Sequence, residues 1–168
     1  LGEPTPYYTD WPSHSSLFGI FDLAGLPKDR YYLYRSHWNR NEETLHILPH
    51  WNWEGREGEI TPVFVYTNYP SAELFINGKS QGVRTKDLSV TVHNSGDSLS
   101  VANLKRQQRY RLMWMDTVYE PGTVKVVAYD AEGNTVAHRD IHTAGKPHHI
   151  ELEADRTAIK ADGKDLSF

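Results

Sequence analysis

The sequence predicts a mainly β fold, a β-sandwich, preceded by a loop and one helix. After residue 45, about seven short stretches alternate apolar and polar residues, and turn signals separate them at regular spacing. Asn77-Gly78 gives a second indication. Both residues tolerate positive φ, so the pair favours a type I′ hairpin between residues 71–76 and 79–83. Regularly spaced short strands joined by tight turns are typical of sandwiches.

The N-terminal part has a different pattern. Prolines disfavour a helix in residues 1–16, which we interpret as a loop. Pro27 suits the first turn of a helix, and Tyr31, Tyr34 and Trp38 follow at helical spacing. The sequence therefore predicts one helix ending near residue 38, and no second helix.

Alternation continues through the rest of the chain. Strands are expected at residues 45–51, 60–67, 110–114 and 148–154, besides the hairpin. The apolar members of these strands should form the core of the sandwich. The predicted core comprises Val63, Val65, Leu74, Ile76, Leu112, Trp114, Val124 and Val126.

Composition excludes several classes of partner. The 168 residues carry a net charge of −4 with mixed signs, so no basic patch indicates nucleic acid. No apolar run is long enough to span a bilayer, and the absence of cysteine excludes thiolate metal sites. Residues 1–6 contain no Met and no signal-peptide pattern, so we expect the chain to be cut from a longer protein.

Four segments resemble a known family. Residues 71–82 read SAELFINGKSQG and resemble the VELFLNGKSLG hairpin of family 2 glycoside hydrolases, the β-galactosidase-like group. That hairpin belongs to the immunoglobulin-like domain behind the catalytic barrel. Three more segments are similar to the same family in the same order. They read SSLFGIFDLAGLPKDRYYLYRSHW, LHILPHWNWEGREGE and YEPGTVKVVAYDAEGNTVAHRDIHTAG.

The resemblance implies a domain organisation. Residues 1–44 would be the last loop and helix of a (β/α)₈ barrel, and residues 45–145 an immunoglobulin-like β-sandwich. Residues 146–168 would be a linker and the truncated start of a further β domain. Because residues 17–38 are apolar and aromatic, we expect them to self-associate or to fold back over the sandwich beside Trp51 and Trp53.

The resemblance also implies a function. The parent would be a retaining glycoside hydrolase of terminal β-glycosidic bonds, and this piece would brace the barrel, with a loop in position to wall the substrate cleft. Its expected partners are the remainder of the parent and, in the parent, the carbohydrate substrate. A periplasmic or secreted parent is expected, and no cofactor. The alternative is a stand-alone carbohydrate-binding or adhesion sandwich.

No catalytic residue is expected in this chain. In the family the two catalytic glutamates lie upstream of the segment that LGEP, residues 1–4, resembles. Retaining hydrolysis needs two carboxylates about 5 Å apart on a rigid scaffold. The acidic pairs here lie in polar or turn-rich surroundings, and we interpret them as solvated surface groups. They are Glu42/Glu43, Glu54/Glu57/Glu59 and Glu151/Glu153.

Five aromatic residues are candidates for carbohydrate contact. Trp51 and Trp53 flank Asn52, so an extended chain projects both rings to one side, where they would stack on a sugar or pack against the missing barrel. The other three, in the loop after the last barrel strand, would line the cleft or cover the barrel rim. They are Tyr7, Tyr8 and Trp11. The nine histidines show no metal-ligand spacing, so no metal site is expected.

Overall fold

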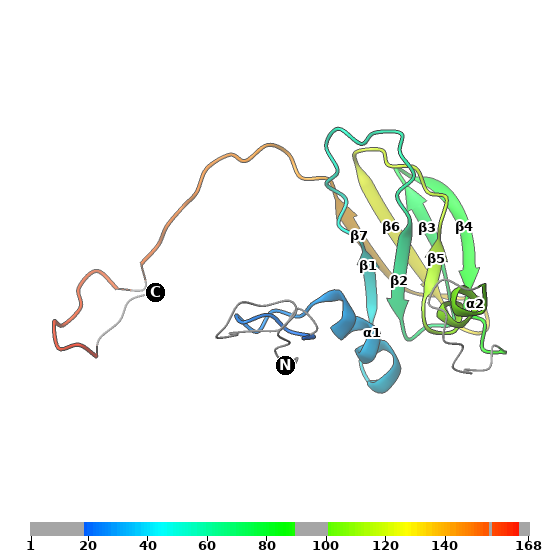
Figure 1. The fold of residues 1–168 in the computed structure, drawn as a ribbon, viewed down its shortest axis with the longest axis horizontal. Helices are drawn as coiled ribbons and strands as arrows, with labels where there is room; N and C mark the ends of the chain where they lie inside the picture. Colours follow the sequence, from blue (N-terminus) through cyan, green and yellow to red (C-terminus); the bar gives the residue numbers. More distant parts are fainter. Residues whose placement is uncertain (1–18, 90–100, 155, 165–168) are drawn as a thin grey trace.

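The structure, a computed structural model, describes residues 19–89, 101–154 and 156–164. Seven strands and two helices follow one another along this part of the chain (Figure 1). In chain order they are α1 (Asp29–Trp38), β1 (Leu45–Leu48), β2 (Val63–Thr67), β3 (Ser71–Ile76), β4 (Lys79–Thr85), α2 (Val101–Tyr110), β5 (Leu112–Trp114), β6 (Thr123–Tyr129) and β7 (Thr135–His142).

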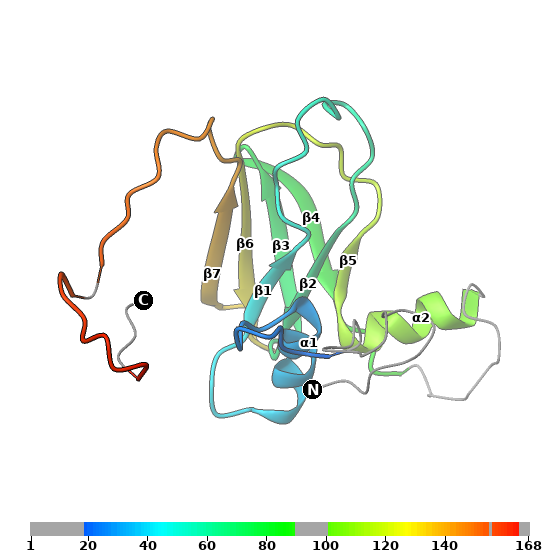
Figure 2. The ribbon, with the colours of Figure 1, turned by 60° about the vertical axis from the view of Figure 1, so that its left-hand side comes forward.

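The strands form two antiparallel sheets that face each other. One has the order β1-β2-β5 and the other β4-β3-β6-β7 (Figure 2). Three strands facing four is an arrangement of immunoglobulin-like sandwiches. The predicted fold class, a mainly β sandwich preceded by a helix, is therefore confirmed.

The β3–β4 hairpin turns at the residues that the sequence indicates. Asn77 has φ of 49° and Gly78 φ of 80°, so both adopt the positive values that a type I′ turn requires. β3 then pairs with β4 on one side and with β6 on the other, which makes it a central strand of its sheet. The predicted hairpin is confirmed.

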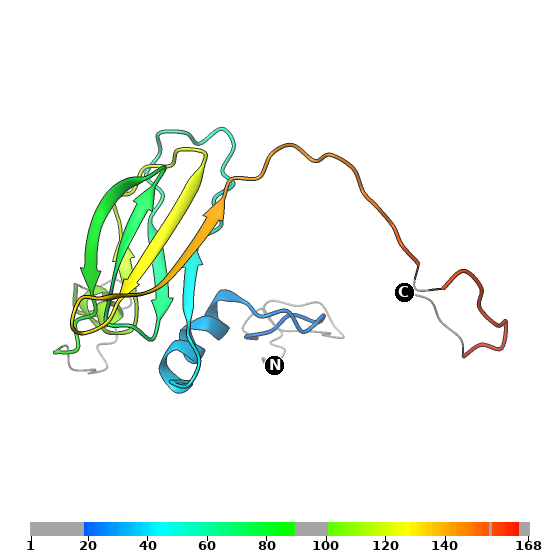
Figure 3. The same ribbon diagram turned by 180° about the vertical axis from the view of Figure 1, so that it is seen from behind.

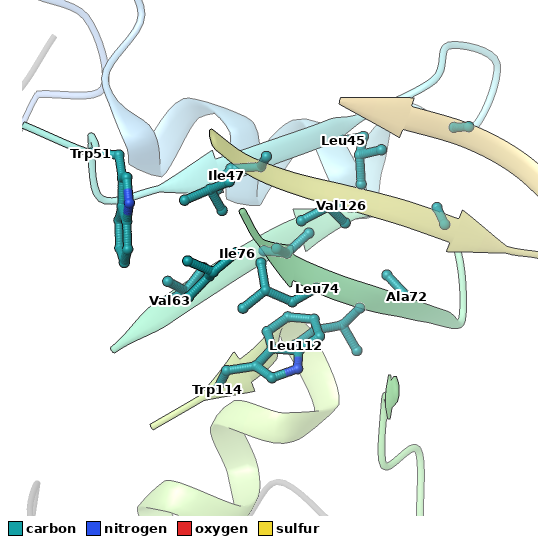
Figure 4. Close-up of a cluster of buried hydrophobic side chains, with 14 of the residues drawn as sticks. Leu45, Ile47, Trp51, Val63, Ala72, Leu74, Ile76, Leu112, Trp114 and Val126 are labelled. Atoms are coloured by element: carbon teal, nitrogen blue, oxygen red, sulfur yellow. The ribbon is translucent and has the colours of Figure 1, made fainter. Parts of the chain in front are cut away.

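The core lies between the two sheets (Figure 4). All eight residues of the predicted core are buried, none more than 4% exposed. Each is an apolar residue of a strand in which apolar and polar residues alternate. This alternation therefore identifies the face of each strand that points into the core. Trp51 and Tyr119, from the loops, complete the core at its edge.

Two strands are shorter than expected because of prolines. β1 ends at Leu48, just before Pro49, and β2 begins at Val63, just after Pro62. Proline has no backbone N–H to donate to a ladder, so it marks the limits of a strand. Trp51 consequently lies in a loop.

The prediction of a single helix is wrong, since α2 occupies Val101–Tyr110. The strand expected at residues 110–114 is reduced to β5, with Tyr110 closing the helix. Residues 104–109 read Leu-Lys-Arg-Gln-Gln-Arg, and all of these have high helix propensity. The prediction relied on the alternation of apolar and polar residues and did not take this helix propensity into account.

The strand expected at residues 148–154 is also absent. This segment has no strand assignment and lies beyond β7, on the chain that leaves the sandwich (Figure 3). An alternating stretch becomes a strand only when another strand supplies hydrogen-bond partners. No described strand pairs with it. Within the described residues, no helix is long and apolar enough to cross a membrane.

Candidate functional site

The first feature of interest is the attachment of α1 to the sandwich. Asp29, in the first turn of the helix, lies with Oδ1 at 2.7 Å from Nε2 of His46 on β1. Tyr32 stacks on the same imidazole with ring centroids 3.9 Å apart. Nε of Arg35 donates to the hydroxyl of Thr44 at 3.1 Å. These contacts hold one side of α1 against the three-stranded sheet.

His46 is partly shielded from water by this packing. Burial lowers the pKa of His46, and the neighbouring Asp29 carboxylate opposes that effect. Neither His46 nor Asp29 stands out in the sequence, where the histidines show no metal-ligand spacing. Their pairing joins residues 17 positions apart, which spacing along the chain does not reveal.

The other side of the N-terminal segment exposes large apolar side chains. Trp38 at the end of α1 is 78% exposed, and its ring stacks on that of Tyr34 at 4.8 Å. Leu23 and Leu26, before the helix, are 75% and 63% exposed. We call Leu23, Leu26 and Trp38 the exposed apolar residues of the α1 segment. Such residues on a folded chain indicate a surface for another protein part.

The α1 segment packs on the sandwich, one of the two outcomes expected from the sequence, through His46 and Thr44 on the side of β1 and β2. The expected position beside Trp51 and Trp53 stays a prediction. The Tyr31 ring is also packed, 5.0 Å from that of Phe21, whereas Trp38 stays in solvent. The helical stripe predicted from the spacing of aromatic residues is thus only partly buried.

Trp51 is not available to a sugar in this structure. Its side chain is 1% exposed, and its Nε1 donates to the carbonyl oxygen of Glu120 at 2.9 Å. Its ring meets that of Tyr119 edge-on at 5.1 Å. Trp51 packs inside the sandwich, so neither expected role, sugar platform or contact with the barrel, agrees with its position. The alternation of Trp51 and Trp53 could not show which layer the rings would face.

Trp53 is half-buried and is covered by polar side chains. The imidazole of His50 stacks on its ring at 4.3 Å, and the guanidinium of Arg56 lies 5.1 Å from the ring centroid. Its Nε1 is buried and has no hydrogen-bond partner within the described part of the chain. Sugar contact by Trp53 remains a prediction. The remaining candidates, Tyr7, Tyr8 and Trp11, lie outside the described residues.

The acidic groups singled out in the sequence are all exposed. Glu59 pairs with Arg56 at 2.7 Å, and Glu57 accepts from the backbone of Gly55. Glu42 and Glu43 precede β1, far along the chain from the C-terminal pair. This is the solvated-surface position expected from the sequence. Among the described residues, no group of three His, Cys, Asp or Glu side chains forms a metal site.

The described chain is a seven-stranded sandwich with a docked helix and large exposed apolar side chains beside it. Comparison with known proteins gives relatives of one kind. A family model described as a domain of unknown function, DUF4982, matches residues 58–137. The chain is 49% identical over its whole length to the β-galactosidase BoGH2A of Bacteroides ovatus, and 32% identical over 163 residues to a putative β-glucuronidase of Formosa agariphila.

A solved structure is similar as well. The glycosyl hydrolase family 2 member of Bacteroides cellulosilyticus superposes with a TM-score of 0.66 and 31% identity, over 89% of this chain and 20% of that one. Over its whole length the chain is therefore similar to a region of family 2 glycoside hydrolases. It spans 17% of the length of the Bacteroides ovatus relative and 14% of the Formosa agariphila relative.

Proposed function

We propose that the whole protein hydrolyses terminal β-glycosidic bonds, as a β-galactosidase-like enzyme, and that the region described here braces its catalytic barrel. Support comes from the 49% identity to a β-galactosidase over all of this chain. Residues 1–44 would close the barrel, residues 45–145 would form the bracing sandwich, and residues 146–168 would lead into a further β domain.

The exposed apolar residues of the α1 segment carry this proposal. One side of α1 is fixed to the sandwich by His46 and Thr44, so the opposite side is held in a defined position. A Trp that is 78% exposed gains on the order of 25 cal/mol per Å² of apolar surface when a partner covers it. The barrel is the partner that adjoins this segment in the family.

A loop of the same region would wall the substrate cleft. Tyr7, Tyr8 and Trp11 precede the α1 segment, and the loops after barrel strands form the active sites of barrel enzymes. In the whole enzyme, Trp11→Ala should raise KM severalfold with little change in melting temperature. An unchanged KM would leave this loop with a structural role only.

The alternative, a stand-alone carbohydrate-binding or adhesion sandwich, is not favoured. This alternative requires Trp51 and Trp53 to form the sugar-binding surface, but Trp51 is buried in the core. The match to a β-galactosidase also continues through residues 1–44, outside the sandwich. A stand-alone binding sandwich would not require residues 1–44.

The bracing role is tested in the whole enzyme. Trp38→Ser should lower its melting temperature by several degrees and reduce hydrolysis of nitrophenyl β-galactoside. Val83→Ser is a matched control, because Val83 is 50% exposed on β4, away from α1. Bracing is excluded if Trp38→Ser and Leu26→Ser both behave like the control.

A further inference from the structure

A cavity of about 460 Å³ lies where four parts of the chain meet. The end of α1, the β2–β3 turn, the segment after β4 and the end of α2 all contribute to its wall. Four basic residues line it: His37, Arg40, Lys86 and Arg109. Among the described residues, no carboxylate belongs to its lining. The wall is therefore strongly positive.

Lys86 is the most shielded of these basic groups. Its Nζ donates to the carbonyl oxygen of Thr67. An ammonium group has three N–H bonds to donate, so this contact uses one of them. Burial alone lowers the pKa of Lys86 to about 8, which leaves it charged at neutral pH. A partly dehydrated ammonium gains more from a nearby anion than one in bulk water.

The charges of the cluster are close enough to act on one another. Nε2 of His37 lies 3.0 Å from the carbonyl oxygen of Tyr110. Burial lowers the pKa of His37, this carbonyl contact opposes the shift, and the charges of Lys86, Arg40 and Arg109 lower it further. Three cations thus repel a proton at one imidazole.

Two acidic residues of the described chain lie next to lining residues and have hydrogen-bond partners of their own. Oε2 of Glu43 accepts from the hydroxyl of Tyr69 at 3.4 Å. Asp87 follows Lys86 in the chain, and its Oδ1 accepts from the backbone and the hydroxyl of Ser89. These hydrogen bonds lower the pKa of Asp87, so its carboxylate is satisfied without the cavity cations.

We propose that this cavity binds a small oxyanion: a carboxylate, sulfate or phosphate, either free or carried on a monosaccharide. Lys86 and Arg40 supply charge-assisted hydrogen bonds, which are short and strong. The volume is that of a small-molecule pocket rather than of a single water site. Its lining includes none of the exposed apolar residues of the α1 segment.

Calorimetric titration of the 168-residue chain tests the proposal. The probes are sodium phosphate, sodium sulfate, glucuronate and, as the uncharged control, galactose, all at constant ionic strength with chloride. Saturable binding of at least one anion, and none of galactose, is expected. Tightest binding of phosphate or sulfate identifies a free anion, and tightest binding of glucuronate identifies a sugar acid.

Substitutions locate the site. Lys86→Met should weaken anion binding by at least tenfold and Arg40→Gln severalfold, whereas Lys79→Met, an exposed lysine of the hairpin, should leave it unchanged. If Lys86→Met does not fold, Arg40→Gln decides, because Arg40 is exposed. The proposal is overturned if no anion binds saturably, if galactose binds equally well, or if Arg40→Gln binds as tightly as the unmodified chain.

Discussion

The indole Nε1 of Trp51 donates a hydrogen bond to the carbonyl oxygen of Glu120, across 2.9 Å. Trp51 follows β1 in one sheet, and Glu120 lies in the connection from β5 of that sheet to β6 of the other. The hydroxyl of Thr143, just after β7, donates to the carbonyl oxygen of Trp51 at 2.6 Å. Trp51 thus ties both sheets together at one end of the core.

Removal of the Trp51 side chain should therefore be costly. Trp51→Ala should lower the free energy of unfolding by about 3–5 kcal/mol, because it leaves a large cavity. Trp51→Phe should cost less, since it keeps most of the apolar volume and loses the bond to Glu120, itself worth about 1 kcal/mol. Urea unfolding of the chain measures both. In the isolated chain the control Trp38→Ala should change stability by about 0.5 kcal/mol or less. Equal costs for the two alanine variants would refute the role of Trp51.

Any residue with a side chain in place of Gly122 should lower the stability of the fold. A Cβ there would overlap the Asn77 amide, which accepts from the backbone N–H of Thr123 at 2.8 Å and donates to the carbonyl of Pro121 at 3.2 Å. Gly122→Ala should break both bonds, each worth about 0.5–1.5 kcal/mol, in addition to the strain of its positive φ.

The control for Gly122 is Gly133→Ala. Gly133 also has positive φ, 86°, but open space where a Cβ would stand, so only about 1–2 kcal/mol of backbone strain is expected. Thermal melts of the two variants compare the costs directly. If the Gly133 variant melts at or below the temperature of the Gly122 variant, the contact with Asn77 has no energetic weight.

Lys86 should make stability depend on pH in the alkaline range. Burial lowers its pKa from 10.5 to about 8 in the folded chain. Between these values the unfolded chain holds the proton and the folded chain releases it, so stability rises with pH across this window. The rise from Lys86 is at most about 3 kcal/mol. Below pH 8 both states hold the proton, and the slope from this group vanishes.

Urea unfolding of the chain and of Lys86→Met at pH 7, 8.5 and 10 isolates this effect. The variant should lack the rise, and its stability relative to the unmodified chain should fall mainly between pH 8.5 and pH 10. Tyrosines whose pKa is raised by burial, such as Tyr69, titrate alike in both proteins and cancel. Parallel curves would show that Lys86 is well hydrated in the folded chain.

The N-terminal segment should be separable from the sandwich. Deletion of residues 1–41 should leave a soluble chain that unfolds cooperatively, since the eight predicted core residues lie beyond it. It should also abolish any self-association, because Leu23, Leu26 and Trp38 are removed. Light scattering and thermal melts of both chains test this. An unfolded shortened chain would place the domain boundary elsewhere and make α1 integral to the sandwich.

Sequence patterns correctly predicted those parts of the fold that depend on residues close together in the chain. Alternation identified core residues such as Leu74 and Trp114, and Asn77-Gly78 identified its own turn. Contacts between distant segments were not accessible. Trp51 bonds to Glu120, 69 residues away, and the cavity lined by Lys86 brings the end of α1 next to the end of α2, so no spacing along the chain indicates either one.

The four-stranded sheet ends in β4 and β7, each of which pairs with only one strand of the described chain. Both strands carry exposed charges, with Lys79 and Arg84 on β4 and Arg139 and Asp140 on β7. Charges on an edge oppose the addition of a foreign strand. These charges therefore oppose β-aggregation at both ends of the four-stranded sheet, whether or not another part of the protein covers the α1 segment.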